Sequence, residues 1–259
     1  MRQPGGFKDH FSSRAAEYER RRPGYPRELF GFLADSAPAR RLAVDVATGN
    51  GQAATGLAGF FEQVLATEPS EAQLARARPH PRVRYRCEPA ERISLPDASC
   101  QLLTAAQAAH WFDWDAFPGE ATRVLVPGGV VALWTYELFS VDPCIDGLVL
   151  DFYRNVTGPY WPRERRYVEE KYATLPFPFQ EFAAPSFRFQ LDWTVADAIA
   201  YLGTWSAVPR CLGARGSDPV ALVAPRLAAA WGPGTRRVSW PIHLRVGRKP
   251  GGDRPRAGG

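Results

Sequence analysis

A short turn between two apolar segments carries the residues of this sequence best suited to bind a nucleotide. The stretch VDVATGNGQAA, residues 44–54, places Asp45 inside an apolar run and then breaks at Gly49 and Gly51. Glycines let a backbone approach a ligand closely, and a helix that begins just after them offers N–H groups to it. Glu68 follows 19 residues after Gly49, where a carboxylate can accept the hydroxyl groups of a ribose. These residues predict a site for a cofactor with an adenosine end.

Two classes of cofactor fit the turn when it is taken alone. Residues 49–54 match the G-x-G-x-x-A pattern of dinucleotide-binding turns, so an NAD-dependent oxidoreductase is one interpretation. Asp45 favours another, because a carboxylate in the preceding strand would repel a pyrophosphate and suits a ligand that carries an ammonium group. The aromatic run AAHWFDWD around His110, and an end of the chain without a separate substrate domain, point the same way.

The elements that must position these residues alternate along the chain. Apolar runs predict strands at 42–47, 63–67, 83–87, 100–107 and 129–136, and the segments between them predict helices at 52–61, 70–78 and 114–125, the last interrupted by Pro118. Such alternation predicts a parallel sheet with helices on both faces. Further helices are predicted at 7–22, 27–37, 142–156, 194–206 and 217–231, and further strands at 186–193 and 238–246. Residues 157–185 are rich in proline and aromatics, and we expect them to pack over the sheet.

Composition excludes several classes of protein. The 259 residues are 45% hydrophobic and 23% charged, with a formal net charge of +5, which is ordinary for a globular protein and does not demand nucleic acid. The four cysteines lack metal-ligand spacing, so no metal site is expected. Neither a signal peptide nor a membrane span is predicted, and we expect a cytoplasmic protein.

Several segments together resemble the class I S-adenosylmethionine-dependent methyltransferases, in particular the methyltransferase type 11 and trans-aconitate-methyltransferase-like branch. The segments are FSSRAAEYERRRPGYP, VDVATGNGQAA, ATEPSEAQLARA, AAQAAHWFD, VLVPGGVVALW and TWSAVPR. The resemblance spans about residues 7–246 and departs at Ala47, where the family has a glycine. It implies an α/β fold: a Rossmann-like, doubly wound, seven-stranded, mostly parallel sheet with helices on both faces and an antiparallel last strand.

The resemblance also implies a single domain at 1–247. Its parts are a helical lid at 1–40, a cofactor-binding core at 41–136, a substrate-side insertion at 137–185 and C-terminal strands and helices at 186–247, followed by a disordered tail at 248–259. The implied cofactor-binding residues are Asp45, Ala47, Gly49, Gly51, Glu68, Pro69, Ala90, Glu91 and Gln107, with Tyr18 and Arg22 closing over the cofactor. His110 is the candidate catalytic residue, and Trp111, Tyr160, Trp161 and Arg166 are candidate substrate-binding residues.

The implied reaction is in-line transfer of a methyl group from S-adenosylmethionine to a small molecule, with a carboxylate or hydroxyl oxygen favoured. A hydroxyl acceptor needs a base, for which His110 is the candidate; a carboxylate acceptor would instead need cations such as Arg163, Arg165 or Arg166. His110, Trp111 and Arg22 also have structural interpretations, as core or solvated side chains. A non-catalytic cofactor- or partner-binding protein on the same fold is the alternative. We expect a monomer or homodimer.

Overall fold

The computed structural model describes residues 24–250. The predicted helix at 7–22, with Tyr18 and Arg22, lies outside the described residues, as do residues 251–259 of the predicted tail. The predicted start of the tail at 248 is wrong, because Arg248 ends a strand and the Lys249 N–H donates to the Gly129 carbonyl.

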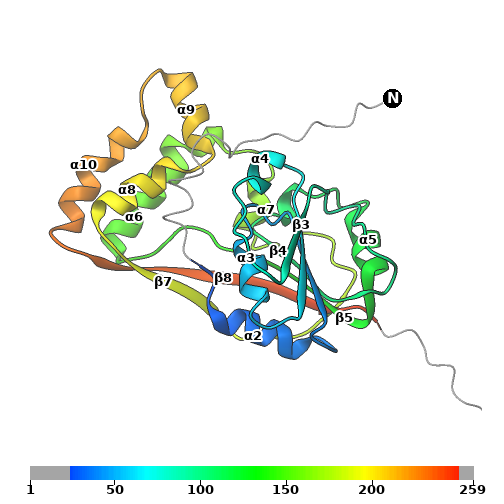
Figure 1. The fold of residues 1–259 in the computed structure, drawn as a ribbon. Coiled ribbons are helices and arrows are strands. Elements are labelled where there is room, and N and C mark those ends of the chain that lie inside the picture. The colour runs from blue at the N-terminus through cyan, green and yellow to red at the C-terminus, as the bar shows by residue number, and fades with distance from the viewer. Residues whose placement is uncertain (1–23, 251–259) are drawn as a thin grey trace, which may run out of the picture.

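One sheet organises the described chain (Figure 1), with the strand order β3-β2-β1-β4-β5-β8-β6 and with β7 paired to β8 off this path. Its strands are β1 (Leu42–Val46), β2 (Gln63–Thr67), β3 (Val83–Arg86), β4 (Cys100–Ala106), β5 (Leu125–Thr135), β6 (Gln180–Glu181), β7 (Phe187–Trp193) and β8 (Arg236–Arg248). Strands β1 to β5 pair in parallel, and β8 runs antiparallel to β5. The predicted α/β sheet with an antiparallel last strand is confirmed. The short β6, inside the segment expected to lie over the sheet, is an eighth strand.

Helices cover both faces of the sheet because its central strands are apolar on both sides. On one face lie α2 (Arg27–Ser36) and α3 (Gln52–Leu57), which bury Leu29, Leu33 and Leu57 completely. On the other face lie α5 (Phe117–Val124) and α7 (Arg165–Glu169), with Phe117 and Val168 in a second apolar cluster. The described part of the predicted lid, α2, thus belongs to the core.

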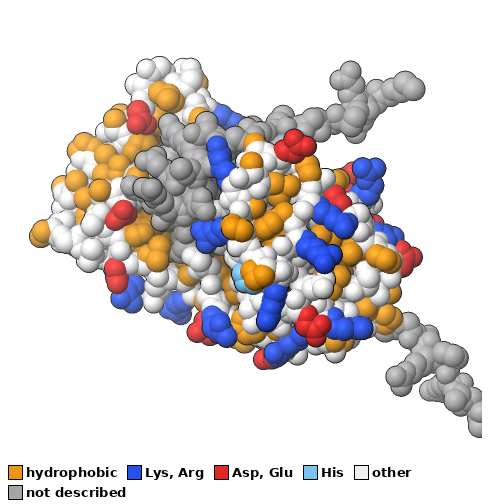
Figure 2. Space-filling model, in the orientation of Figure 1, with side chains coloured by type: hydrophobic (Ala, Val, Ile, Leu, Met, Phe, Trp, Pro, Cys, Tyr) orange, Lys and Arg blue, Asp and Glu red, His pale blue; other side chains and the backbone are white. Residues whose placement is uncertain are grey.

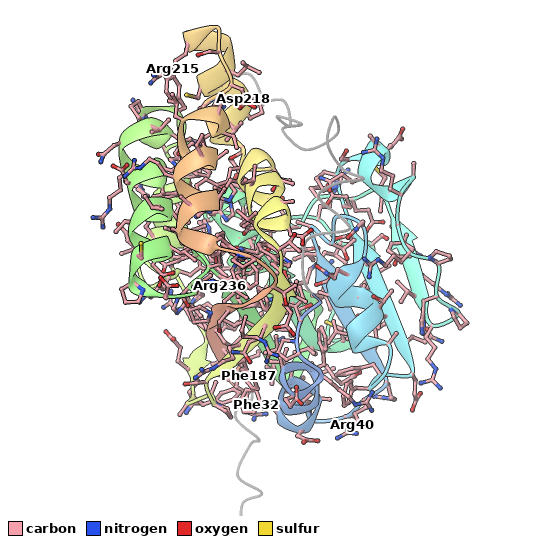
Figure 3. The ribbon with its side chains drawn as sticks, turned by 90° about the vertical axis from the view of Figure 1, so that its left-hand side faces the viewer. Phe32, Arg40, Phe187, Arg215, Asp218 and Arg236 are labelled. Carbon is pink, nitrogen blue, oxygen red and sulfur yellow. The ribbon has the colours of Figure 1, made fainter. Side chains whose placement is uncertain are left out.

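The carboxyl edge of the sheet is extended by a two-stranded ribbon. Residues 243–248 of β8 pair with β5, whereas residues 236–242 pair with β7. Because β8 is antiparallel to β5, its first half continues past Thr135, where β5 ends. At the base of the ribbon, Phe187 of β7 lies beside Phe32 of α2 (Figure 3), with 5.7 Å between the two ring centroids.

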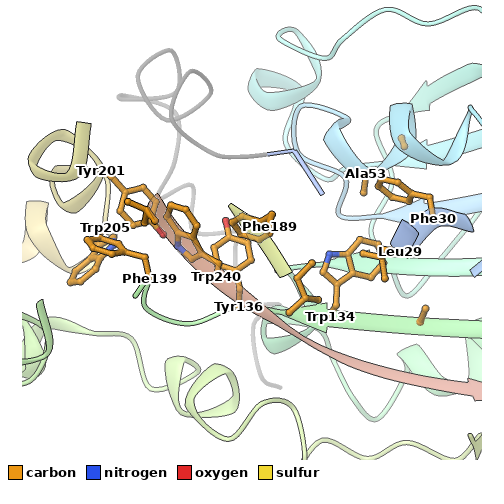
Figure 4. Close-up of a cluster of buried hydrophobic side chains, with 14 of the residues drawn as sticks. Leu29, Phe30, Ala53, Trp134, Tyr136, Phe139, Phe189, Tyr201, Trp205 and Trp240 are labelled. Atoms are coloured by element: carbon orange, nitrogen blue, oxygen red, sulfur yellow. The ribbon is translucent and has the colours of Figure 1, made fainter. Parts of the chain in front are cut away.

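The ribbon carries a group of helices that stands beyond the carboxyl edge of the sheet, here called the helical lobe (Figure 1). It consists of α6 (Pro143–Asp151), α8 (Val195–Gly203), α9 (Ala207–Arg215) and α10 (Val220–Trp231). Helix α10 packs against α6 and α8. One buried cluster runs from Leu29 and Trp134 at the sheet to Tyr201 and Trp205 at the lobe (Figure 4), so sheet and lobe share a core.

Some predicted boundaries are wrong, for identifiable reasons. Helix α5 is not interrupted by Pro118, which lies in its first turn, where its missing N–H is not needed. The predicted helix at 70–78 is reduced to α4 (Glu71–Leu74), which the side chain of Ser70 caps. Helix α9 was not predicted. Pro241 lies in the half of β8 that pairs with β7, beyond the end of β5.

Three short helical turns, η2 (Ala109–Trp111), η3 (Phe152–Val156) and η4 (Gly158–Tyr160), complete the connections at the carboxyl edge. On the face shown in Figure 2, basic and acidic side chains are interspersed. Within residues 24–250, no helix has the length and apolar character needed to cross a bilayer.

Candidate functional site

The turn after β1 contains backbone conformations with positive φ, which glycine adopts readily. Gly49 has φ +60° and Gly51, the residue before α3, has φ +84°. A Cβ atom at Gly51 would overlap the Tyr85 hydroxyl of β3, which donates to the Arg78 carbonyl at 2.7 Å. Ala47 also has a positive φ, +49°. It therefore adopts a left-handed backbone conformation that is strained for alanine and that glycine would adopt without strain.

Glu68 follows β2 and faces this turn. Only 3% of the residue is exposed. Its Oε2 accepts from the Gly49 N–H at 3.0 Å, and its Oε1 accepts from the Ser70 N–H at 3.1 Å. A carboxylate has about four lone-pair sites, so two backbone donors fix its orientation without exhausting its capacity for the hydroxyl groups of a ribose.

Asp45 lies beneath the turn and is completely buried. Its Oδ2 accepts from the Thr48 hydroxyl at 2.5 Å, and its Oδ1 accepts from the Thr104 hydroxyl at 2.7 Å. Burial raises its pKa to about 6, against the lowering effect of these two hydrogen bonds. Because the Thr48 carbonyl accepts from the Gly51 N–H at 3.0 Å, Asp45 supports the turn from below. Its predicted contact with an ammonium group remains a prediction.

Three of the predicted cofactor-binding residues lie in the chain between the turn and β4, and the family resemblance places two of them, Ala90 and Glu91, at the adenine. Pro69 is half-buried beside Glu68, and Ala90 is 3% exposed within the apolar core. Glu91 accepts from the Asp113 N–H at 2.9 Å through Oε1. The Glu91 carboxylate therefore joins this loop to the segment after η2, and its role toward the adenine stays a prediction.

Gln107 stands at the carboxyl end of β4 in a strained backbone, with φ +55°. Its Nε2 donates to the Tyr136 carbonyl at 3.0 Å, and its Oε1 accepts from the Thr135 hydroxyl at 2.5 Å. The side-chain amide is thus fixed across the ends of β4 and β5, at the edge where ligands bind in open α/β sheets.

His110 of η2 is held by a residue that the sequence analysis missed. Its Nδ1 lies 3.0 Å from the hydroxyl oxygen of Tyr172, and its ring centroid lies 4.8 Å from that of Trp111. Tyr172 is fully buried, and burial raises its pKa above the ordinary value, although a hydrogen bond with Thr135 acts in the opposite direction. The Tyr172 side chain beside His110 is therefore a neutral phenol. No local pattern signals this pair, because 62 residues separate its members.

Two adjacent hollows lie between the carboxyl edge and the helical lobe. A narrow pocket of about 70 Å³ is lined by Gln107, His110 and Trp111 on the sheet side and by Tyr201 and Trp205 on the lobe side. A wider cavity of about 820 Å³ is lined by Leu150, Tyr153, Arg166 and Glu169, among others. The two share the residues Glu137, Leu138, Trp161, Pro162 and Arg165.

Aromatic rings form the wall at this junction. The Trp161 ring centroid lies 5.0 Å from that of Tyr153 and 5.6 Å from that of Trp205. Of the predicted substrate-binding residues, Trp111 lines the narrow pocket, Arg166 the wide cavity, and Trp161 both. Tyr160 lines neither, although its carbonyl accepts from Arg210 at 3.5 Å.

The arrangement fits S-adenosylmethionine. Glu68 offers a fixed buried carboxylate that can accept the hydroxyl groups of a ribose, and the Gln107 amide is fixed beside the narrow pocket. The space beside Gly51 is taken by the Tyr85 hydroxyl. Among residues 24–250, no three His, Cys, Asp or Glu side chains are grouped so that they could hold a metal ion.

Comparison with known proteins identifies the family. Residues 44–133 match the model of a methyltransferase domain. The chain is 32% identical over 232 residues to a protein assigned as a methyltransferase in Dictyostelium discoideum, covering 88% of each chain. It is 37% identical over 156 residues to an uncharacterized methyltransferase of Mycobacterium tuberculosis, covering 54% of this chain and 63% of the relative.

A solved structure agrees in fold as well as in sequence. The protein, assigned as a type II methyltransferase from Anaeromyxobacter dehalogenans, superposes with a TM-score of 0.84 at 48% identity, covering 89% of this chain and 99% of the other. Of the two cofactor classes that fit the turn, S-adenosylmethionine is the one that this family uses. The chain belongs to the class I S-adenosylmethionine-dependent methyltransferases.

Proposed function

We propose that the protein transfers the methyl group of S-adenosylmethionine to an oxygen atom of a small-molecule acceptor. The observation that carries this proposal is the cavity of about 820 Å³, which borders, at Trp161 and Arg165, the narrow pocket beside Gln107 and His110. A cavity of this volume suits a ligand the size of a metabolite. The narrow pocket leaves room for one functional group next to the cofactor side.

The residues around the pocket would align the acceptor and exclude water. S-adenosylmethionine supplies, when bound, a methyl group on a positively charged sulfur, so the reaction needs alignment more than activation. Trp111, Trp161 and Trp205 line the pocket and would restrict the directions from which the acceptor can approach. For a hydroxyl acceptor, His110 is placed to take the proton, whereas a carboxylate acceptor has no proton to lose. The assignment to the trans-aconitate-methyltransferase-like branch stays a prediction.

Methyl transfer from labelled S-adenosylmethionine tests the proposal. The purified protein is incubated with panels of small carboxylic acids, phenols and alcohols, and in parallel with a protein mixture and with RNA. We expect label in a low-molecular-weight product as an ester or ether, and none with a Glu68→Ala variant. Label only in macromolecules contradicts the proposal, and cofactor binding without turnover on any panel supports the non-catalytic alternative.

A further inference from the structure

We infer that the acceptor is a small organic acid and that Arg165 binds its carboxylate at the junction of the two hollows. This inference rests on the proposed function and adds to it the class of the substrate and the residue that selects it. The sequence analysis singled out Arg166 for substrate binding and offered Arg165 only as one of several cations. The structure separates the two: Arg165 is half-buried and lines both hollows, whereas Arg166 is exposed and lines only the wide cavity.

The guanidinium of Arg165 is held in position by aromatic residues. Its central carbon lies 4.8 Å from the ring centroid of Trp161 and 5.4 Å from that of Tyr153. Its Nε donates to the Tyr153 hydroxyl oxygen at 3.0 Å, and that hydroxyl donates to Glu169 at 2.5 Å. A planar cation fixed in this way loses little conformational freedom when it binds a ligand.

The terminal nitrogens of Arg165 differ from those of three other half-buried arginines. In the described part of the chain, Arg123, Arg236 and Arg245 each form an ion pair with a carboxylate. Within residues 24–250, no carboxylate pairs with Arg165, and its one hydrogen bond, to Tyr153, uses Nε. The two terminal nitrogens are therefore available as a pair of parallel donors, which is the arrangement that binds a carboxylate in a bidentate manner.

The other charges of the wide cavity favour an anion as well. Arg154, Arg163, Arg165 and Arg166 line it, against two acids, Glu137 and Glu169. Both acids have partners, since Glu137 lies 3.3 Å from His243 Nε2 and Glu169 accepts from Tyr153. Three of these arginines are exposed and act mainly through a screened, long-range field, whereas Arg165 sits on Trp161, where water is partly excluded and a charge-assisted hydrogen bond is stronger.

The remaining lining describes the rest of the ligand. Leu138, Leu150, Trp161 and Pro162 give the cavity an apolar side, which suits a planar or aliphatic body attached to the carboxylate. A phosphate ester offers similar oxygen atoms, and the experiment below separates the two sources of negative charge.

The test is a binding screen that does not require turnover. The protein, saturated with S-adenosylhomocysteine, is screened by calorimetry against several hundred small carboxylic acids, their neutral amides and the corresponding phosphate esters. We expect the tightest ligands to be acids that bind at least tenfold more tightly than their amides. Arg165→Met should weaken these acids roughly 10- to 100-fold, as expected for the loss of one or two charge-assisted hydrogen bonds. Arg215→Met, at an exposed arginine at the end of α9 that lines neither hollow, is the matched control and should change their affinity less than threefold.

Further measurements distinguish a misfolded variant, a failure of the inference and a failure of the proposed function. Unchanged melting temperature and S-adenosylhomocysteine affinity show that Arg165→Met is folded, and Arg165→Lys, which keeps the charge but not the paired donors, should fall between wild type and Arg165→Met. Acids that bind no better than amides, acids insensitive to Arg165→Met, or a preference for phosphate esters would overturn the inference. Arg165-dependent binding without methyl transfer would leave the inference standing and refute the proposed function. Methylation of neutral compounds with unchanged kcat and KM in Arg165→Met would refute the inference and leave the proposed function standing.

Discussion

The Oε2 atom of Glu68 accepts a hydrogen bond from the backbone N–H of Gly49, with 3.0 Å between the two atoms. This bond joins the acid after β2 to the glycine turn after β1, so that each holds the other in place. The turn is supported from below by Asp45 through Thr48. The cofactor end of the site is therefore one hydrogen-bonded unit built at the carboxyl ends of two neighbouring strands.

Replacing Glu68 by Gln tests this unit. An amide has the same shape but no charge, and its nitrogen would face one of the two backbone N–H donors of Gly49 and Ser70. We expect the affinity for S-adenosylhomocysteine to fall roughly 10- to 100-fold, because a charged acceptor of hydroxyl groups is lost. Equilibrium dialysis measures the change. Glu71→Gln, on the exposed first turn of α4, is the control, and equal affinities for the two variants would refute the assigned role of Glu68.

Replacing Gly51 by Ala should cost more stability than its backbone angle alone explains. The alanine would have to keep a positive φ, and its Cβ would also overlap the ring of Tyr85. Gly216 provides the matched control, because it has φ +72° and a Cβ added there would meet no atom within 4 Å. We expect Gly216→Ala to lower the free energy of unfolding by about 1 kcal/mol and Gly51→Ala by at least about 2 kcal/mol. Urea unfolding measures both, and equal losses would mean that Tyr85 does not restrict the turn.

Asp45 should make the stability depend on pH in a direction opposite to that of most acids. Its pKa is raised from 3.8 to about 6 by burial, so between these values the folded protein keeps a proton that the unfolded chain releases. The free energy of unfolding must then fall as the pH rises from about 4 to about 6, by on the order of 3 kcal/mol from this group, and stay level above that.

The Asp45→Asn variant isolates this contribution, because other titrating groups are shared with the wild type. We expect the difference in unfolding free energy, wild type minus variant, to decrease by about 2–3 kcal/mol between pH 4 and pH 7. Urea unfolding at a series of pH values provides the difference. A difference that is constant, or that increases with pH, is incompatible with a buried Asp45 of raised pKa.

Replacing Tyr172 by Phe should slow methyl transfer to any acceptor that reacts through a hydroxyl group. The change removes the oxygen that lies 3.0 Å from His110 Nδ1 and keeps the buried ring. We expect a kcat at least roughly tenfold lower and a shifted pH profile of kcat, with S-adenosylhomocysteine affinity within twofold of the wild type. An unaltered kcat and pH profile for a hydroxyl acceptor would mean that Tyr172 does not position the base.

Much of the sheet could be predicted because buried parallel strands are short and continuously apolar. The predicted strand at 63–67 has its observed bounds, and the predicted helices at 70–78 and 194–206 begin at Ser70 and Thr194, whose side chains cap α4 and α8. Helix α9 escaped detection because Pro209, in its first turn, is typical of a helix break. The alternation in 236–248 predicts a strand, but this pattern does not indicate that the two halves of the strand pair with different strands, β7 and β5.

The proximity of the candidate cofactor residues could be predicted more fully than that of the candidate acceptor residues, for a similar reason. Glu68 and Gly49 follow neighbouring strands whose order the βαβ pattern fixes, so their proximity is implied by the fold. Arg165 and Tyr172 lie in the proline-rich segment, where no periodic pattern exists. The sequence offers no reason to prefer Arg165 over Arg166; that choice depends on which side chain stacks on Trp161.

Calorimetry on the wild-type protein tests the central claim, that the Glu68–Gly49 unit holds S-adenosylmethionine. Titration with S-adenosylhomocysteine should release or absorb heat that saturates at one molecule per chain, and S-adenosylmethionine should compete for the same site, whereas NAD should give no signal. Saturable heat with NAD, together with no signal from either S-adenosyl compound, would contradict this account.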